Sequence, residues 1–244
     1  MSPTTALADF RGALRSSAFT VALTGAGVST DSGIPDFRGD AGLWTDVDPM
    51  DVASVEGFEA DPARFYRFWA GKFAAIADAE PGPAHRYLAS LEEQGQLHGI
   101  VTQNIDGLHQ KAGSKRVIEA HGSFQEVHCL SCGAVEGVAT VFARAGARAP
   151  ACQTCGGRRL KPGVVLFGEA LPASFAEADA WARRSELLIA MGTSLGVYPV
   201  AGLVAVAKRS GARIAILNRD PTPFDAEADW VLHGELRELV GALT

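Results

Sequence analysis

Five short apolar stretches alternate with amphipathic stretches along this chain of 244 residues. The apolar stretches, in which β-branched residues are frequent, span 19–23, 98–102, 186–191, 213–217 and 230–232. Helical periodicity occupies the amphipathic stretches 5–15, 83–93, 172–184, 200–209 and 235–243. Strands that alternate with helices in this way form a parallel sheet with helices on its faces. The pattern therefore predicts an α/β fold built on one doubly wound parallel sheet, which a chain of this length can bury without disulfides.

Two segments depart from this alternation. Residues 61–80 place large apolar side chains at helical spacing, at Phe65, Trp69, Phe73 and Ile76. This spacing predicts a helical insert. The second segment, residues 124–161, contains every cysteine of the chain.

The four cysteines form two CxxC pairs, Cys129 with Cys132 and Cys152 with Cys155, separated by the 19 residues 133–151. This spacing is typical of a zinc site with four thiolate ligands. A cytosolic chain keeps its thiols reduced, so a metal explains the pairs better than disulfides do. A redox-active CxxC and four unrelated buried thiols remain as alternatives. Four thiolates leave no coordination position for water, so a zinc ion here would be structural.

Acidic side chains outnumber basic ones by 28 to 22, which gives a formal net charge of −6. Lys and Arg form no run longer than two residues, so we do not expect nucleic acid as a ligand. No stretch approaches the ~18 apolar residues of a membrane span. The first 17 residues also lack the apolar core of a secretion signal. We therefore expect a cytoplasmic protein that associates with no membrane.

A glycine-rich turn, residues 24–29 (TGAGVS), follows the first predicted strand. Glycines in such a turn let backbone N–H groups approach a pyrophosphate at a helix start, although any α/β protein can carry two glycines there. The dehydrogenase fingerprint needs a third glycine, where Thr30 stands, and an acidic residue at the end of a second strand. Neither is present, so the turn favours a nucleotide without supporting hydride transfer.

Polar residues follow several of the other predicted strands. Ligands of doubly wound sheets bind beyond the carboxyl ends of the strands, where the sequence places Gln103, Asn104, Asp106, Gly192, Thr193, Ser194 and Asn218. Helix N-capping is an alternative role for Thr193 and Ser194. His121 has the residue type of a general base at neutral pH, although a lone histidine beside a glycine is more often structural. The loop 33–39 could close over a ligand or be a structural Ω-loop.

The motifs of the chain read, in order, GAGVST, SGIPDFR, TQNIDGLH, HG, two CxxC pairs, KPGVVLFGE, MGTSL and LN. This combination spans nearly the whole chain and resembles the sirtuin family of NAD-dependent protein deacylases, in particular bacterial members of the class II branch. The resemblance implies a Rossmann-like NAD-binding domain over 1–38, 82–123 and 161–244. It also implies a cofactor loop and helical module over 39–81 and a zinc-binding module over 124–160.

The resemblance assigns roles to single residues. NAD would be bound by Gly25, Ala26, Gly27, Ser29, Asp36, Phe37, Arg38, Gln103, Asn104, Ile105, Asp106, Gly192, Thr193, Ser194, Asn218 and Leu236. An acyl-lysine protein or peptide would pair as an added strand with Val165, Leu166, Phe167, Gly168, Glu169 and Val197. The catalytic residues would be Asn104, Asp106 and His121, of which His121 is the general base.

The implied reaction transfers the acyl group of a lysine to the ADP-ribose part of NAD and yields nicotinamide, O-acyl-ADP-ribose and free lysine. Two alternatives remain: protein mono-ADP-ribosyl transfer at the same NAD site, and a sensor that binds NAD or acyl-lysine without catalysis. The presence of His121 disfavours the sensor, because binding alone needs no base. We expect a monomer with NAD as co-substrate and Zn²⁺ as a structural cofactor.

The chain departs from the family pattern at positions that bear on the substrate. Lys161 stands where the family usually has Arg before the proline, and this change leaves the turn intact. Members that prefer acidic acyl groups carry a Tyr and, three residues later, an Arg, whereas the matching positions here are Trp69 and Lys72. Lys is a poorer bidentate partner for a carboxylate than Arg. The resemblance therefore predicts weaker removal of succinyl groups than of acetyl groups.

Overall fold

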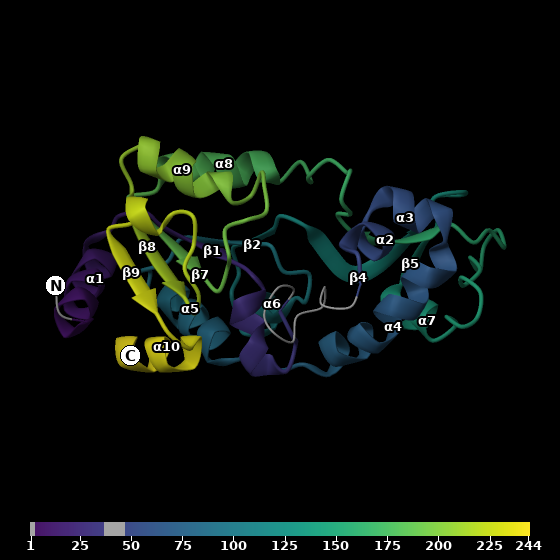
Figure 1. The fold of residues 1–244 in the computed structure, drawn as a ribbon, viewed down its shortest axis with the longest axis horizontal. Coiled ribbons are helices and arrows are strands. Elements are labelled where there is room, and N and C mark those ends of the chain that lie inside the picture. Colours follow the sequence, from purple (N-terminus) through teal and green to yellow (C-terminus); the bar gives the residue numbers. More distant parts are fainter. Residues whose placement is uncertain (1–2, 37–46) are drawn as a thin grey trace.

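The computed structural model describes residues 3–36 and 47–244. A parallel sheet of six strands, in the order β3-β2-β1-β7-β8-β9, forms one half of the molecule (Figure 1). Its strands are β1 (Thr20–Thr24), β2 (Gly99–Thr102), β3 (Val117–Glu119), β7 (Leu187–Met191), β8 (Arg213–Asn218) and β9 (Trp230–His233). All five expected strands are present. The additional strand, β3, has only three residues and gives no recognisable apolar run in the sequence.

The strand order creates a crevice at the carboxyl ends of the strands. Numbered within the sheet alone, the order is 3-2-1-4-5-6, as in Rossmann folds. The order reverses between β1 and β7, which pair in parallel with Thr24 opposite Met191. Ligands of such sheets bind at this reversal, outside the carboxyl ends of the strands. The glycine-rich turn after β1 and Gly192 after β7 both lie at that point.

Helices cover both faces of the sheet (Figure 1). On one face, α1 (Pro3–Ser16), α5 (Pro83–Glu93) and α10 (Leu236–Leu243) share a buried core. On the other face, α8 (Phe175–Arg184) and α9 (Gly202–Arg209) share a second core. All five predicted helices are therefore present. Helices α8 and α9 start later than expected, because the Phe175 and Gly202 N–H groups close turns onto the Pro172 and Pro199 carbonyls.

The other half of the molecule contains an antiparallel sheet, β5-β4-β6, and the helices near it (Figure 1). Its elements are α2 (Pro49–Ala53), α3 (Val55–Ala60), α4 (Pro62–Asp78), β4 (Gly122–Cys129), β5 (Val135–Gly137), α7 (Val138–Phe142) and β6 (Leu160–Val164). Asp61 accepts a hydrogen bond from the Arg64 N–H at 2.9 Å and caps α4. Helix α4 confirms the predicted helical insert, whereas the strands of the cysteine segment were not predicted.

Three short helical segments complete the fold: η1 (Ala26–Ser32), α6 (Leu108–Lys111) and η2 (Asp225–Glu227). The glycine-rich turn therefore opens a 3₁₀ helix. In the described part of the chain, no helix has the length and apolar character needed to cross a membrane.

Candidate active site

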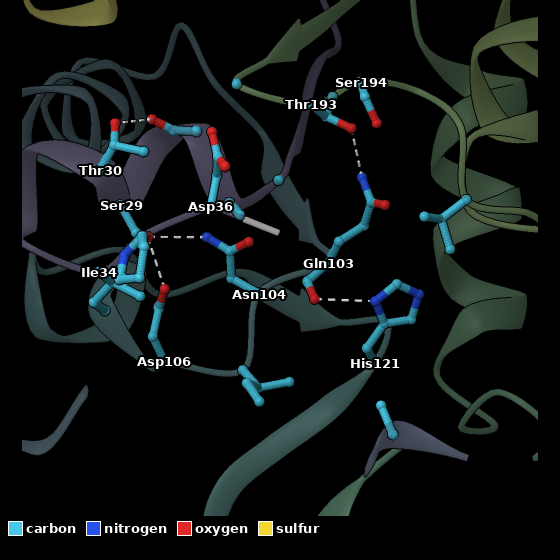
Figure 2. Close-up of a pocket in the computed structure, with 18 of the residues that line it drawn as sticks. Ser29, Thr30, Ile34, Asp36, Gln103, Asn104, Asp106, His121, Thr193 and Ser194 are labelled. Atoms are coloured by element: carbon cyan, nitrogen blue, oxygen red, sulfur yellow. Dashed lines mark hydrogen bonds between the residues drawn. The ribbon is translucent and has the colours of Figure 1, made fainter. Parts of the chain in front are cut away.

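The crevice between the two halves contains a cavity of about 650 Å³ (Figure 2). The residues that line it come from the turns after β1, β2, β7 and β8, from α4, and from the segment after β6. Every described residue to which the sequence assigned an NAD-binding, substrate-binding or catalytic role is among them. Phe37 and Arg38 lie outside the described residues. Sequence reasoning therefore selected residues that the fold brings together around one cavity.

Three glycines allow the turns after β1 and β7 to touch. The Gly27 N–H donates to the Gly192 carbonyl at 2.8 Å. A Cβ on Gly27 would lie 2.8 Å from the Gly192 Cα, and a Cβ on Gly25 would lie 2.8 Å from the Thr193 Cβ. Gly192 itself has a φ of 61°, which glycine adopts without strain. The glycines are thus needed for contact between two backbone turns, and Ala26 keeps an N–H without a partner among the described residues.

Ser29 connects the polar residues at the centre of the cavity (Figure 2). Its hydroxyl donates to the Asp106 Oδ2 at 2.7 Å and accepts from the Asn104 Nδ2 at 3.0 Å. Asp106 Oδ1 also accepts from the Leu108 N–H at 2.9 Å. The Asn104 amide group is thereby fixed with its Nδ2 toward Ser29. Its Oδ1 has no partner among the described residues and remains available to a ligand hydroxyl.

His85 forms a weak hydrogen bond with Ser29, a contact that the sequence did not predict. The Gly82 N–H donates to His85 Nδ1 at 3.1 Å, so the proton of the neutral ring sits on Nε2. Nε2 lies 3.4 Å from the Ser29 Oγ and donates to it weakly. Burial lowers the pKa of His85, although Asp106 opposes the shift. No motif around His85 indicated this contact, which depends on how α5 packs against η1.

One ring nitrogen of His121 contacts the backbone, and the other has no partner among the described residues. Its Nδ1 lies 3.0 Å from the Gln103 carbonyl oxygen, which can only accept a hydrogen bond (Figure 2). Nδ1 therefore carries the proton of the neutral ring, and Nε2 carries the lone pair. Burial lowers the pKa of His121, and the bond to Gln103 partly opposes the shift. The ring is thus held as a neutral base whose tautomer is set by the backbone.

Gln103 joins the ends of β2 and β7. Its Nε2 donates to the Thr193 Oγ1 at 2.9 Å, and the same oxygen accepts from the Leu195 N–H at 3.2 Å. At the far end of the cavity, Asn218 Nδ2 donates to the Asp220 carbonyl at 2.7 Å. Arg219 also lines the cavity and forms an ion pair with Asp36 at 3.8 Å. Sequence reasoning did not select Arg219.

In the segment after β6, some backbone groups are hydrogen-bonded within the protein, and one carbonyl has no partner among the described residues. The Val165 N–H donates to the His121 carbonyl at 2.8 Å, so this segment is tied directly to the histidine turn. The Phe167 N–H donates to the Ala53 carbonyl at 2.8 Å, and the Phe167 carbonyl accepts from the Val55 N–H at 3.0 Å. The Val165 carbonyl has no partner among the described residues. An added strand can therefore pair with only part of the segment, and Val165 is one of the available positions.

The wall formed by α4 contains Trp69 and Lys72. Trp69 is 5% exposed, and its indole N–H donates to the Val52 carbonyl at 2.7 Å. The Lys72 Nζ lies 3.7 Å from the centre of the Phe68 ring, and burial lowers the pKa of this amine. Lys72 therefore presents a single cationic group to the cavity.

The four cysteine sulfurs lie close enough together to bind one metal ion. The Sγ atoms of Cys129 and Cys155 are 3.7 Å apart, those of Cys132 and Cys152 are 3.8 Å apart, and all four lie within 4.8 Å of one another. Four sulfurs at ~2.3 Å from a zinc ion are separated by about 3.8 Å. The cysteines are free, with no disulfide among them. Hydrogen bonding from the Ser131 N–H lowers the pKa of Cys129, and a bound zinc ion would favour the thiolate form of all four cysteines.

His109 makes folding stability depend on pH. It is 1% exposed, its Nε2 lies 2.9 Å from the Thr24 Oγ1, and its ring centre lies 4.8 Å from that of His85. Burial, and secondarily His85, lower the pKa of His109 to about 3. Below pH ~6.5 the unfolded chain binds a proton at this residue and the folded chain does not. We expect the free energy of unfolding to fall by about 1.4 kcal/mol per pH unit from this residue alone as the pH drops from ~6.5 toward 4.

Urea unfolding at several pH values measures this dependence. His109→Gln retains a donor toward Thr24 and does not titrate, so its slope between pH 6.5 and 4.5 should be smaller than that of the wild type. Some slope remains, because burial also lowers the pKa values of His85 and His121. Equal slopes in the two proteins would contradict this prediction.

Known proteins are similar to this chain in both sequence and fold. The Sir2 family model matches residues 25–199. An NAD-dependent protein deacetylase of Saccharolobus solfataricus is 45% identical over 221 residues, which cover 90% of this chain and 88% of that protein. A solved Sir2 structure with a deacetylated p53 peptide and 3′-O-acetyl ADP-ribose has a TM-score of 0.93 at 38% identity, covering 97% of this chain and 96% of the other. A Sir2 structure with p53 peptide and NAD⁺ has a TM-score of 0.88 at 39% identity, covering 96% and 95%. This chain belongs to the Sir2 family.

Proposed function

We propose that this protein is an NAD-dependent deacylase that removes acyl groups from lysine side chains and yields nicotinamide, O-acyl-ADP-ribose and free lysine. The observation that carries the proposal is the neutral His121 base, whose Nε2 lone pair is available in the same cavity as the Ser29, Asn104 and Asp106 network. A protein that only senses NAD would not need such a base. The names of the relatives support the same reaction.

The residues around the glycine-rich turn fit NAD. The Ala26 N–H, which no described residue bonds, and the 3₁₀ helix that starts there suit a phosphate oxygen. Thr193, Ser194 and Asn218 follow β7 and β8 and would contact the adenosine part. NAD supplies a ribose carbon that accepts the acyl oxygen once nicotinamide leaves.

The chain's own groups would then act on hydroxyls and protons. Asn104 Oδ1 and the Asp106 carboxylate would orient ribose hydroxyls, because Ser29 fixes both side chains. His121 Nε2 would take a proton from one ribose hydroxyl, and the resulting oxygen would attack the acyl carbon. Water would then add to that carbon while its bond to the lysine nitrogen breaks, which frees the lysine and leaves the acyl group on the ribose. The Gln103 carbonyl would stabilise the resulting imidazolium through Nδ1.

The segment after β6 would hold the acyl-lysine. The Val165 carbonyl has no partner in the described part of the chain and would accept the N–H of an acyl-lysine side chain. Phe167 and Tyr198 are exposed to 41% and 66%, and both line the cavity at its outer part. The substrate would lie between them as an extended strand. Apolar walls around the acyl chain would exclude water.

We extend the proposal to the domains, the location and the oligomeric state of the protein. The parallel sheet and its helices would form the NAD-binding domain, and residues 124–160 would form a zinc-binding module whose four thiolates leave the metal no open position. The four free cysteines suit a reducing, cytoplasmic location. We also propose that the protein acts as a monomer on peptide substrates.

Mass spectrometry of an acyl-lysine peptide after incubation with NAD tests the function. The peptide should lose its acyl group, and the loss should require NAD. A peptide or protein that instead gains ADP-ribose and keeps its acyl groups would identify a mono-ADP-ribosyltransferase.

We expect wild-type protein to remove succinyl groups at least roughly tenfold less efficiently than acetyl groups, because Lys72 offers one point charge where a carboxylate is bound best by a bidentate guanidinium. The indole N–H of Trp69 is already bonded to Val52 and cannot help. The double variant Trp69→Tyr with Lys72→Arg should raise kcat/KM for a succinyl peptide and not for an acetyl peptide.

The prediction is tested by measuring kcat/KM of the wild type and of the double variant on acetyl and succinyl peptides of the same sequence. Lys208→Arg is the control, because Lys208 pairs with Asp229 and is not among the described residues that line the cavity. Equal or greater desuccinylation by the wild type would refute the prediction.

A further inference from the structure

We propose that Phe142 is a positioning residue for the acyl-lysine channel, by which we mean the part of the cavity between Trp69 of α4 and Val165 of the segment after β6. Through Phe142 the zinc-binding segment would control the binding of acyl-peptides separately from that of NAD. Phe142 lies between the two cysteine pairs, on α7. The inference rests on the proposed deacylase function and explains what holds the substrate side of that site in place.

Phe142 contacts three other aromatic residues in the half of the molecule that contains the antiparallel sheet. It is 7% exposed and is not among the described residues that line the cavity. Its ring centre lies 4.9 Å from that of Phe73, 5.0 Å from that of Tyr66 and 5.3 Å from that of Phe124. Phe73 and Tyr66 belong to α4. Phe142 therefore packs the zinc-binding segment directly against α4.

Phe142 is connected to one wall of the channel through Phe124 and then through Trp69, which belongs to α4. The ring of Phe124 lies 6.0 Å from that of Trp69, and Trp69 lines the cavity. The Trp69 indole is fixed at its other end by Val52. A change in the packing of Phe142 would thus shift the wall of the channel without removing any group that touches the substrate.

A second connection reaches the opposite wall. The Tyr66 hydroxyl, beside Phe142, donates to the Leu160 carbonyl at 2.8 Å. Leu160 begins β6, and β6 leads directly from the second cysteine pair into the segment that contains Val165. Both walls of the channel are therefore tied to one cluster of side chains.

The cluster belongs to a core that is separate from those of the NAD side. Cys129, Cys152 and Phe142 share this core with Trp69 and Leu166. The strands that carry the glycine-rich turn and Gly192 contribute to two other cores. Loosening the third core should therefore change the channel and leave the turns around NAD in place. Ile105, which packs against the third core, marks where the two sides meet.

The test compares Phe142→Leu with Phe10→Leu. Both substitutions remove ring atoms from a buried phenylalanine, but Phe10 belongs to α1 and packs in a core of the NAD side. We expect Phe142→Leu to raise the KM for an acyl-peptide by roughly 10- to 100-fold, because small misplacements of a substrate site are costly. Its NAD affinity, measured by calorimetry without peptide, should stay close to that of the wild type. Phe10→Leu should lower thermal stability and leave the peptide KM unchanged.

Zinc removal supplies a readout that does not depend on activity. Protein treated with a chelator should lose affinity for a fluorescent acyl-peptide and keep its affinity for NAD, both measured as binding. The proposal is overturned if Phe142→Leu weakens NAD binding as much as peptide binding, if Phe10→Leu raises the peptide KM equally, or if chelation leaves peptide binding intact. A wild-type protein that binds peptide and NAD without deacylating would refute the proposed function and leave these binding tests valid.

Discussion

Replacing His121 with alanine should lower kcat for deacylation by roughly 10²- to 10⁴-fold, the usual contribution of a positioned general base. The backbone carbonyl of Gln103 holds Nδ1, so Nε2 is the only ring nitrogen of His121 that can take a proton in the neutral state. NAD should still bind, because the glycine-rich turn and the Ser29 network do not depend on this ring. The measurement is kcat from nicotinamide release, with NAD affinity measured separately.

The pH profile and a second histidine provide the controls. Burial lowers the pKa of His121, so the base stays neutral below pH ~6.5 and the acid limb of kcat/KM should lie below that value. His128→Ala removes an exposed histidine of β4 and should leave kcat unchanged. Wild-type rates in His121→Ala would remove His121 from the reaction.

Gly27→Ala should weaken NAD binding by roughly 100-fold and destabilise the fold by roughly 2 to 4 kcal/mol. The added Cβ would lie 2.8 Å from the Gly192 Cα and 2.9 Å from its carbonyl oxygen, so the two turns must separate. Separation also breaks the hydrogen bond between Gly27 N and Gly192 O. Thermal unfolding and calorimetric titration with NAD measure the two effects.

Gly12→Ala is the matched control for this substitution. Gly12 lies within α1, and a Cβ there would meet nothing within 4 Å. Alanine should stabilise this helix by up to ~1 kcal/mol and leave NAD affinity unchanged. If Gly27→Ala behaves like Gly12→Ala, the close approach of the two turns does not matter for binding.

The parallel sheet could be predicted from the sequence because each of its long strands is buried on both faces. Strand β7 is an example, since all five of its residues are buried and read as an unbroken apolar run. Strand β4 has burial that alternates irregularly, with a register shift between Gly122 and Val127. Such a strand has no clear period, so the antiparallel sheet could not be predicted.

The candidate site was predicted from motifs, but the contacts within it were not. The motifs placed Gly25 and Gly27 at a nucleotide, whereas the structure shows that their first requirement is contact with Gly192 and Thr193. His85 was missed because its contact with Ser29 spans 56 residues of sequence. Contacts between distant segments depend on helix packing, which a single sequence does not encode in any local pattern.

Product analysis of a single reaction tests the central claim most directly. Purified protein, NAD and an acetyl-lysine peptide are incubated together, and nicotinamide, free-lysine peptide and O-acetyl-ADP-ribose are quantified at several times by liquid chromatography and mass spectrometry. We expect the three products in equal amounts, because each acyl group removed consumes one NAD. Release of nicotinamide without free lysine, or of free lysine and acetate without use of NAD, would contradict the proposed deacylase.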